Sequence, residues 1–277
     1  MILSTNLKRA DLNLLSKTLV VHQGALGDQL LSLPLLHHLS QDHSITYLGR
    51  GLGRELIELF MSFKTLDLNQ SPKKLKECLK GMDFQKSISI GSIDWLSFDS
   101  RIHVTLETWT EHQMPIWQSW GQQITNTVLA PYFINSSNSK PSRLIIAPGS
   151  GSLKKNWNLE QYIELSNQLS LKIELTILMG PTECDLGMHS QWNNLNGAGT
   201  LSLCPNHLEL NTLYQSATHF IGNDSGPAHL ASVYNLKGLV FFISSDMKTW
   251  EPYGQYLTSL KAPKNVLTAL QLFEEKL

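Results

Sequence analysis

The sequence predicts an α/β protein with two Rossmann-like domains, each built on a parallel sheet, and three observations lead to this prediction. Strand-like and helix-like segments alternate along nearly the whole chain, which is typical of parallel sheets with helices on both faces. The alternation stops at a polar stretch, Asn135–Ser142, and restarts after it, so this stretch is the expected linker. The chain has 277 residues, 42% of them hydrophobic, and is therefore long enough for two ordinary domains with cores of their own.

The first half of the chain is expected to alternate between strands and helices. Short runs rich in β-branched residues indicate the strands, and longer segments with apolar residues at helical spacing indicate the helices. The expected strands are residues 18–22, 45–48, 65–68, 87–90 and 102–106, and the expected helices are residues 28–39, 52–63, 72–82 and 117–129. Pro34 lies inside the first of these helices and cannot donate a hydrogen bond to the carbonyl of Leu30, so we expect a kink or a restart there.

The second half repeats this architecture after the polar stretch. Its expected strands are residues 143–147, 173–178, 218–222 and 239–243, and its expected helices are residues 159–169, 208–216, 227–234 and 266–276. The predicted domains are therefore residues 1–137 and 138–277, with the ligand in the cleft at the carboxyl ends of their strands. The last helix is amphipathic, and packing back on the N-terminal domain is one arrangement expected for it.

Composition excludes several classes of protein. The formal net charge is -1 and the sequence pI is about 6.8, which argues against a nucleic-acid binder that relies on bulk phosphate attraction. The three cysteines, Cys78, Cys184 and Cys204, lie far apart in the sequence and lack metal-ligand spacing, so a reducing cytoplasm is the expected location. Polar residues interrupt the apolar run 19–36, so we expect neither a signal peptide nor a transmembrane helix.

The loop His22–Pro34 follows the first expected strand and carries a carboxylate at the start of a helix. Gly24 and Gly27 allow a tight turn beside a ligand, and Asp28 comes directly after them. Two interpretations of Asp28 are open. A carboxylate in the first turn is favoured by the helix dipole, so Asp28 would cap the helix. The other interpretation is a general base that takes a proton from an attacking hydroxyl.

A second loop, Ala147–Tyr162, follows the first strand of the second half and suits a diphosphate. Its glycines and serines at positions 149 to 152 offer backbone N–H groups and hydroxyls, and Lys154 and Lys155 add positive charge. A solvated lysine pair is the alternative. The sequence also predicts a capping box between Asn158 and Gln161, and a hydrophobic staple between Trp157 and Tyr162.

A third segment, Ile221–Ser232 (IGNDSGPAHLAS), reads as a strand end that runs into a helix. Pro227 suits the first helical position, and Gly226 lets a ligand approach the backbone. The unpaired N–H groups and the positive end of the helix dipole favour a phosphate. Asp224, Ser225 and His229 surround this end with groups that bind sugar hydroxyls or phosphate oxygens. An ordinary capped helix is the alternative.

Weaker signals and absences narrow the chemistry. The segment Gly49–Gly53 (GRGLG) has part of a dinucleotide fingerprint, but Arg54 stands where the third glycine would be, which favours a plain strand-to-helix turn. Glu183, in the segment Met179–Glu183, could accept hydrogen bonds from a ribose or a base. The sequence has no Walker loop, HExxH, GxSxG or Asp-x-Asp motif. Any departing diphosphate would therefore be stabilised by helix N-termini and lysine, with no metal required.

Four segments taken together resemble glycosyltransferase family 9, the ADP-heptose-dependent heptosyltransferases of lipopolysaccharide core assembly. They are Gly27–Leu36, Pro148–Trp157, Gly180–Glu183 and Asn223–Ala231, and their order and spacing match over nearly the whole chain. The resemblance implies a GT-B fold, with two Rossmann-like domains facing a central cleft and the donor mostly on the C-terminal one. It also implies metal-independent transfer with inversion at the sugar carbon, and no cofactor.

The resemblance assigns roles to individual residues. Asp28 matches the family's proposed catalytic base, and Lys155 matches the lysine that contacts the donor phosphates. The other matches are all on the donor side: Ser150 and Gly151 in the phosphate loop, Glu183 near the nucleoside, and Asp224, Ser225, Gly226 and His229 in the donor-binding motif. The implied partners are a nucleotide sugar and a glycan or glycolipid acceptor, with no nucleic acid. The implied location is the cytoplasm, with peripheral contact at the inner membrane as a further expectation.

Some features leave alternatives open. The chain is short for this family and has few arginines in its first half, so the acceptor is not identified. Residues 72–82 place Lys73, Lys76 and Lys80 on one helical face and apolar residues on another. This helix would meet an anionic membrane or acceptor, or it would be an ordinary surface helix with its apolar face in the core. A nucleotide-sugar epimerase and a non-catalytic homologue are the competing functions.

Overall fold

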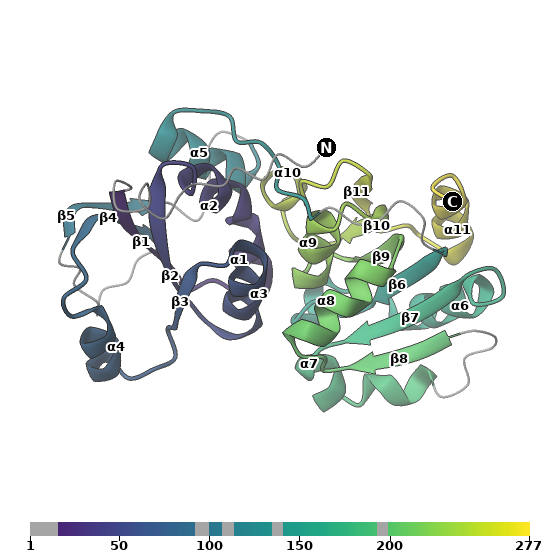
Figure 1. Cartoon of the computed structure of the whole chain (residues 1–277). Coiled ribbons are helices and arrows are strands. Elements are labelled where there is room, and N and C mark those ends of the chain that lie inside the picture. Colours follow the sequence, from purple (N-terminus) through teal and green to yellow (C-terminus); the bar gives the residue numbers. More distant parts are fainter. Residues whose placement is uncertain (1–15, 92–99, 107–113, 135–140, 193–198) are drawn as a thin grey trace. The chain divides into compact units, whose positions relative to one another are not determined.

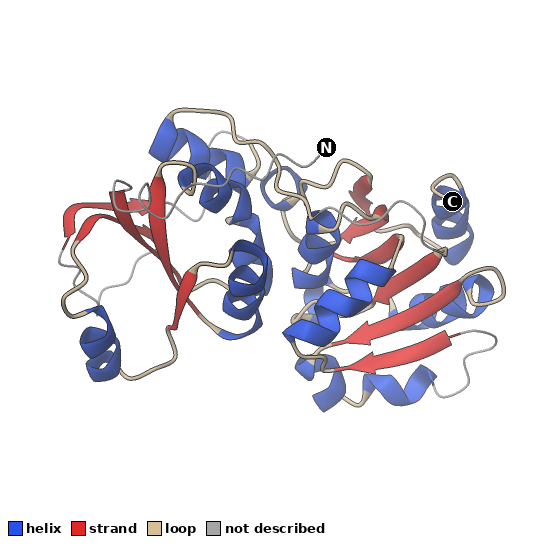
Figure 2. Cartoon of the chain, in the orientation of Figure 1, coloured by secondary structure: helices blue, strands red, loops and turns tan. Residues whose placement is uncertain are grey.

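The computed structural model describes residues 16–91, 100–106, 114–134, 141–192 and 199–277, and the chain divides into two compact units (Figure 1). The first unit contains the described residues up to 106 together with Trp117–Ala130, and the second contains Pro131–Leu277 and the described residues 114–116. Each unit has one parallel sheet, so the predicted α/β class is confirmed (Figure 2). Most of the expected linker, residues 135–140, lies outside the described residues.

The first unit is a five-stranded parallel sheet in the order β3-β2-β1-β4-β5. Its strands are β1 (Ser16–His22), β2 (His43–Gly49), β3 (Lys64–Asp67), β4 (Phe84–Ile90) and β5 (Ser100–Leu106). Its helices are α1 (Leu26–Leu31), α2 (Leu33–Leu39), α3 (Gly51–Met61), α4 (Pro72–Leu79) and α5 (Ile116–Thr125). The central strand β1 ends in five consecutive buried residues, which is typical of a parallel strand covered on both faces.

The predicted effect of Pro34 is confirmed. The expected helix is two helices, because α1 ends at Leu31 and α2 begins at Leu33 with Pro34 in its first turn. Proline has no N–H to donate, and in a first turn that N–H would have no partner within the helix. Ser32, between the two helices, donates its hydroxyl to the carbonyl of Gln29 at 2.6 Å. The interruption therefore ends α1 one turn after Asp28.

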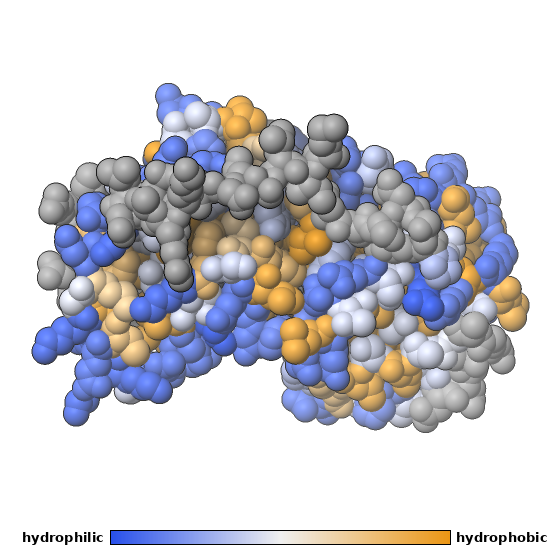
Figure 3. Space-filling view, in the orientation of Figure 1, coloured by the Kyte–Doolittle hydropathy of each residue, from blue (hydrophilic) through white to orange (hydrophobic). Residues whose placement is uncertain are grey.

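The lysine-rich helix α4 uses its apolar face inside the first unit. Leu75 is fully buried, and Leu79 and Met82 pack against the same core cluster, which also contains Leu19 and Phe84. The lysines of this helix are exposed, and the surface over α4 is hydrophilic (Figure 3). The interpretation as a surface helix with its apolar side in the core is therefore confirmed.

The second unit is a six-stranded parallel sheet in the order β11-β10-β9-β6-β7-β8. Its strands are β6 (Arg143–Ala147), β7 (Glu174–Met179), β8 (Gly199–Leu203), β9 (His219–Asn223), β10 (Lys237–Phe242) and β11 (Leu257–Lys261). Its helices are α6 (Leu159–Leu169), α7 (Pro181–Asp185), α8 (His207–Ser216), α9 (Gly226–Val233), α10 (Met247–Trp250) and α11 (Val266–Glu274), with 3₁₀ turns at Leu153–Lys155 and Met188–Trp192.

Two strands of the second sheet, β8 and β11, are absent from the sequence prediction. They are its two edge strands, and each has mostly partly exposed or exposed side chains. Edge strands that face water do not need the continuous apolar run by which a buried strand is recognised. The signal that identifies β6, β7, β9 and β10 is therefore weak in these two.

The last helix, α11, buries its apolar face in the second unit. Val266, Ala269, Leu270 and Phe273 belong to the same core cluster as the apolar residues of β6, β7 and α6. The ring of Phe273 also meets that of His219 edge-on at 5.6 Å. The apolar face of this helix thus packs within its own unit, and its expected packing on the N-terminal domain stays a prediction.

Local signals around Trp157 are partly confirmed. The rings of Trp157 and Tyr162 lie 4.9 Å apart in a T-shaped contact, as the predicted staple requires. Asn158 caps α6 by accepting from the N–H of Gln161 at 3.1 Å. The reciprocal half of the predicted capping box is wrong, because the side chain of Gln161 donates to the carbonyl of Lys264 instead, at 2.9 Å. None of the described helices is both long enough and apolar enough to cross a membrane.

Candidate functional site

The predicted donor residues lie in the loops and first helical turns that follow three strands of the second sheet at their carboxyl ends. Ala147 ends β6, Met179 ends β7 and Asn223 ends β9. Since these strands are parallel and β6 lies between the other two, the three loops emerge at the same edge of the sheet. A cavity of about 490 Å³ in the first unit lies instead at the amino ends of its strands, where Lys17, His43 and other residues line it.

Asn223 holds the loop after β6 in place, a role that the sequence analysis missed. Its side chain is fully buried and makes three hydrogen bonds. The amide nitrogen Nδ2 donates to the carbonyl of Pro148 at 2.7 Å, and Oδ1 accepts from the N–H of Trp157 at 2.9 Å and from the hydroxyl of Tyr162 at 3.0 Å. Because the amide reaches both ends of the loop, it fixes the loop against β9.

The loop between Pro148 and Trp157 has the predicted glycine-rich form. Gly151 has φ +70°, a left-handed conformation that side chains rarely adopt, and a Cβ there would meet open space. The hydroxyl of Ser150 lies 2.9 Å from the carbonyl of Ser152 and 2.5 Å from Oδ1 of Asn156. The hydroxyl of Ser150 therefore donates its hydrogen within the loop. Towards any other group it can act only as an acceptor.

Glu183 lies against this loop. It is buried in the first turn of α7, where its Oε2 accepts from the N–H of Gly180 at 3.0 Å. A Cβ added to Gly149 would lie 2.0 Å from the carboxylate carbon of Glu183, so only glycine leaves room for this acid. The predicted nucleoside residue and the predicted phosphate loop are thus in direct contact.

Most of the remaining predicted donor residues lie around the carboxylate of Asp224. Its side chain is 4% exposed. Oδ2 accepts from Nζ of Lys155 at 3.1 Å, and Oδ1 lies 3.8 Å from Nε2 of the buried His229. Ser245, in the loop after β10, also donates to Oδ2 at 2.5 Å and was not predicted from the sequence. A buried carboxylate needs such partners because isolated charge is costly to remove from water.

Lys155 is the half-exposed member of this cluster. Its side chain is 38% exposed, so part of the ammonium faces solvent while one hydrogen bond holds it on Asp224. Helix α9 begins beside Asp224 at Gly226, and its N-cap residue Ser225 donates its hydroxyl to the carbonyl of Asn223 at 3.0 Å instead of capping the helix. A positively charged amine and a helix N-terminus therefore stand at one place, which is a favourable site for an anion.

Asp28 lies in the first unit, at the carboxyl end of β1. It is the third residue of α1, and its Oδ2 accepts from the N–H of Ala25 at 2.9 Å. This hydrogen bond confirms that Asp28 caps the start of α1. Among the described residues the carboxylate has no other hydrogen-bond partner, so Oδ1 is available to accept a proton. A capping carboxylate with one oxygen fixed and the other available also has the form of an oriented base.

The comparisons with known proteins decide the family. The model of glycosyltransferase family 9 (heptosyltransferase) matches residues 113–271, which is more than half of the chain. The chain belongs to glycosyltransferase family 9. It is a glycosyltransferase, as the four segments in the sequence predicted. A comparison with curated protein sequences gives no match.

Solved structures of other glycosyltransferases share the fold of this chain. The E. coli heptosyltransferase WaaC with ADP has a TM-score of 0.76 at 13% identity, covering 94% of this chain and 100% of that chain. A family 9 glycosyltransferase from Veillonella parvula has a TM-score of 0.72 at 15% identity, with 93% and 90% covered. E. coli ADP-heptose lipopolysaccharide heptosyltransferase II has a TM-score of 0.70 at 13% identity, with 94% and 96% covered. The predicted GT-B fold is thereby confirmed.

In this family 9 glycosyltransferase, His22 positions the loop that carries Asp28, a role not predicted from the sequence. The imidazole is buried and meets the ring of Trp120 edge-on at 5.7 Å. Nδ1 accepts from the N–H of Gly24 at 3.0 Å, so the single proton is on Nε2, which donates to the carbonyl of Asp28 at 3.1 Å. Burial lowers the pKa of His22 from 6.5 to about 4; the hydrogen bond to the carbonyl of Asp28 opposes this shift, and the charge of nearby Arg50 adds to it. His22 is therefore neutral near pH 7.

This neutral histidine predicts a pH-dependent loss of stability. Because the folded pKa lies below the unfolded value, the unfolded chain binds more protons between pH 6.5 and about 4. The contribution of His22 is thus complete above pH 6.5 and is lost as the pH falls to about 4, at a cost of about 3 kcal/mol. Urea unfolding at pH 7 and pH 4 measures it. His22→Gln keeps a donor and an acceptor without titrating, and should unfold with a correspondingly smaller pH dependence; an unchanged dependence would refute the assignment.

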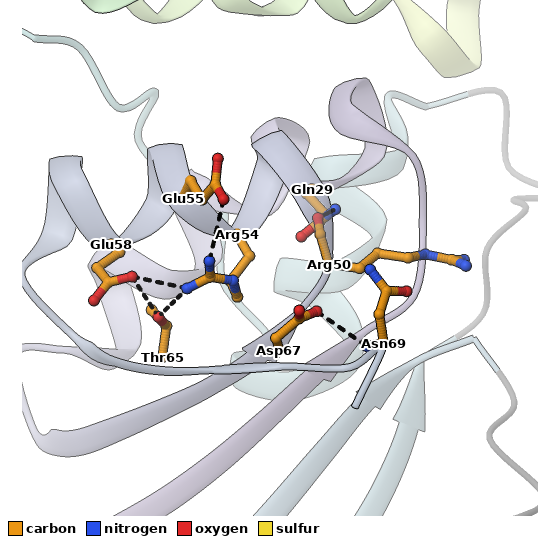
Figure 4. Close-up of polar contacts among 8 residues, drawn as sticks. All are labelled: Gln29, Arg50, Arg54, Glu55, Glu58, Thr65, Asp67 and Asn69. Carbon is orange, nitrogen blue, oxygen red and sulfur yellow. Dashed lines mark hydrogen bonds and ion pairs between the residues drawn. The ribbon is translucent and has the colours of Figure 1, made fainter. Parts of the chain in front are cut away.

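Gln29, in α1, ties the same loop to the end of the neighbouring strand β2. Its Nε2 donates to the carbonyls of Gly24 and Arg50, both at 3.0 Å, and its Oε1 accepts from the hydroxyl of Tyr47 at 3.1 Å. Figure 4 shows Gln29 beside the chain at Arg50, whose side chain extends away from it. The side chain of Arg50 is exposed and forms no ion pair with the described residues.

The segment Gly49–Gly53 is the plain strand-to-helix turn that the sequence favoured. Helix α3 begins at Gly51, and Arg54 binds the carboxylates of Glu58 at 2.9 Å and Glu55 at 3.3 Å, both on its own helix (Figure 4). Arg54 also donates to the hydroxyl of Thr65 on β3 at 3.0 Å. Since two acids already neutralise this arginine, the segment is a structural turn.

Proposed function

We propose that this chain is an inverting, metal-independent glycosyltransferase that moves heptose from ADP-heptose to a hydroxyl of a lipopolysaccharide-core or related glycan acceptor. The observation that carries the proposal is the pairing of Lys155 with Asp224 at 3.1 Å beside the N-terminus of α9. This gives the second unit a positioned ammonium beside the N–H groups of a helix start, and both can donate hydrogen bonds to a diphosphate. Similar structures are described as heptosyltransferases with ADP and with an ADP-heptose analogue, which supports the choice of donor.

The donor would lie along the carboxyl edge of the second sheet. Its diphosphate would meet the ammonium of Lys155 and the first N–H groups of α9, and its nucleoside would lie near Glu183. Asp224 would hold Lys155 in position, and Ser225 and His229 would complete the pocket wall. As the bond to the diphosphate breaks, negative charge grows on the leaving oxygen. Lys155 and the helix end would stabilise that charge, which is why no metal is required in the proposal.

Asp28 would act as the base. Its free Oδ1 takes the proton of the acceptor hydroxyl while the hydroxyl oxygen attacks the anomeric carbon from the face opposite the diphosphate. One C–O bond forms as the other breaks, and ADP leaves. A single displacement of this kind inverts the configuration at that carbon. His22 and Gln29 are positioning residues in this scheme, because they hold the Asp28 loop by hydrogen bonds to its backbone.

The acceptor would bind on the first unit and would carry an anionic group. The exposed Arg50 follows β2, the neighbour of the strand that leads to Asp28, and is available for such a group.

We place the enzyme in the cytoplasm, in peripheral contact with the inner membrane. Because the apolar face of α4 is buried, that contact would depend on the exposed lysines of this helix and on anionic lipids.

A nucleotide panel tests the donor. Titration calorimetry with ADP, GDP and UDP, and with ADP-heptose, GDP-mannose and UDP-glucose, should rank the ADP-linked compounds first. We expect a preference of about tenfold or more over the other bases, since a site that pairs with the base rejects bases that leave its groups unpaired. Binding that does not depend on the base would refute the ADP assignment. Release of ADP from ADP-heptose only when a core acceptor lacking its terminal heptose is present would support transfer over hydrolysis.

A further inference from the structure

Two of the three cysteines, far apart in sequence, meet at the carboxyl edge of the second sheet. Cys184 lies in α7 and Cys204 directly follows β8 (Figure 1). The register pairs Met179 with Leu203, and the N–H of Cys204 donates to the carbonyl of Met179 at 2.8 Å. This places Cys204 beside the start of α7, and its Sγ lies 3.1 Å from Sγ of Cys184. Both cysteines are free thiols, Cys204 exposed and Cys184 partly exposed.

We propose that Cys184 and Cys204 form an oxidation site that closes to a disulfide on reaction with a low-molecular-weight disulfide such as oxidised glutathione. A disulfide has its sulfur atoms about 2 Å apart, so closure needs a shift of about 1 Å from the present separation. Both thiols already point at each other from backbone positions held by helix α7 and by the hydrogen bond to Met179. The remaining cysteine, Cys78, lies on α4 in the other unit and serves as the internal control.

The reaction proceeds by two exchange steps that balance. The thiolate of the exposed Cys204 attacks one sulfur of oxidised glutathione, and one glutathione thiolate leaves and takes up a proton. The thiolate of Cys184 then attacks the sulfur of Cys204 in the mixed disulfide, and the second glutathione leaves in the same way. Two protein thiols are oxidised to one disulfide, and oxidised glutathione is reduced to two thiols.

The second step should be strongly dependent on pH. Burial and the negative charges of Glu183 and Asp185 raise the pKa of the Cys184 thiol, and these causes persist when Cys204 is in the mixed disulfide. The thiolate fraction of Cys184, and with it the closure rate, should therefore rise by about tenfold per pH unit as long as the thiol is mostly protonated. The mixed disulfide at Cys204 would be observable at pH 7 and short-lived at pH 9.

Formation of the disulfide between Cys184 and Cys204 would affect the donor site through α7. Glu183, the residue before Cys184, lies against Gly149 and caps α7 at Gly180. A bond from Cys184 to the end of β8 would fix the turn on which Glu183 sits. On the basis of the proposed function, we expect oxidation to change the affinity for ADP by about fivefold, the lower range of coupling between two sites.

Peptide mapping tests the oxidation site without any assay of function. The full chain is incubated with oxidised glutathione at pH 8, remaining thiols are blocked with iodoacetamide, and peptides are analysed by mass spectrometry. We expect Cys184 and Cys204 in one cross-linked peptide pair and Cys78 alkylated. Cys184→Ser should accumulate glutathione on Cys204, Cys204→Ser should not react at Cys184, and Cys78→Ser should behave like the parent. Alkylation of both Cys184 and Cys204 in the parent chain would overturn the proposal.

ADP titration then tests the coupling. The affinity should change on oxidation, return after treatment with dithiothreitol, and stay constant in Cys184→Ser. An affinity that is equal in the oxidised and reduced chain would refute the coupling. If the chain binds no ADP in either form, the proposed function fails, while the mapped disulfide still decides the oxidation site.

Discussion

Replacing Asp28 by asparagine is expected to lower the rate of sugar transfer on the order of a thousandfold while ADP binding is retained, because removal of a general base costs about 10²–10⁴ in rate. Asparagine keeps an oxygen that accepts from the N–H of Ala25, so the start of α1 is preserved. It has no carboxylate to receive the acceptor proton. The measurement is the initial rate of ADP release from ADP-heptose with the core acceptor, together with calorimetric titration of ADP.

The matched control is Asp83→Asn, which removes an exposed carboxylate of the same unit that has no hydrogen bond or ion pair with the described residues. It should transfer at the parent rate. If Asp28→Asn also transfers at the parent rate, Asp28 is only a helix cap and the base must be another residue. If it binds ADP poorly, the substitution has disturbed more than proton transfer.

Replacing Lys155 by alanine is expected to weaken ADP binding by about tenfold to a hundredfold, since a hydrogen bond to a charged group contributes about 1.5–3 kcal/mol. Transfer should fall further than binding, because the ammonium is proposed to meet charge that grows as the diphosphate departs. Asp224 keeps its contacts with Ser245 and His229, so the loop is expected to stay folded. Calorimetry and the transfer assay, each with subsaturating and saturating donor, separate the two effects.

Lys154 provides the comparison for this variant. It is the adjacent residue in the same 3₁₀ turn and is exposed, but it forms no ion pair with the described residues. Lys154→Ala removes the same charge from the same loop and should bind ADP nearly as the parent does. Equal losses in the two variants would mean that the loop attracts the donor only through bulk charge, and that the contact with Asp224 has no specific role.

The arrangement of the fold was predictable because it follows from local patterns. Buried strands need continuous apolar runs, and Pro34 must interrupt a helix whatever surrounds it. The edge strands β8 and β11 and the packing of α11 depend on what lies beside them in space. A mixed polar sequence such as that of Leu257–Lys261 becomes a strand only because β10 offers it a hydrogen-bonding edge.

The candidate site, like the fold, was predictable only where local sequence patterns determine it. Glycines, acids and lysines at strand ends are visible in the sequence, and so is their resemblance to a family. The groups that hold them were not visible. Asn223 reaches Pro148 and Trp157, and Ser245 reaches Asp224, across long separations in the chain. The ring of His22 makes two hydrogen bonds that fix its tautomer, and the spacing of residues in the sequence does not reveal these bonds.

The contact between Gly149 and Glu183 constrains how the preference for a donor can change within this fold. With no room for a Cβ at Gly149, the acid and the loop cannot change independently. A larger residue at position 149 would displace the acid, and a shorter acid at position 183 would leave the loop unsupported. With the roles proposed above for Glu183 and for the loop, altering base recognition would therefore disturb the binding of the diphosphate. New donor preferences should be reached through paired substitutions at these two positions, and single-site libraries should mostly return weakened enzymes.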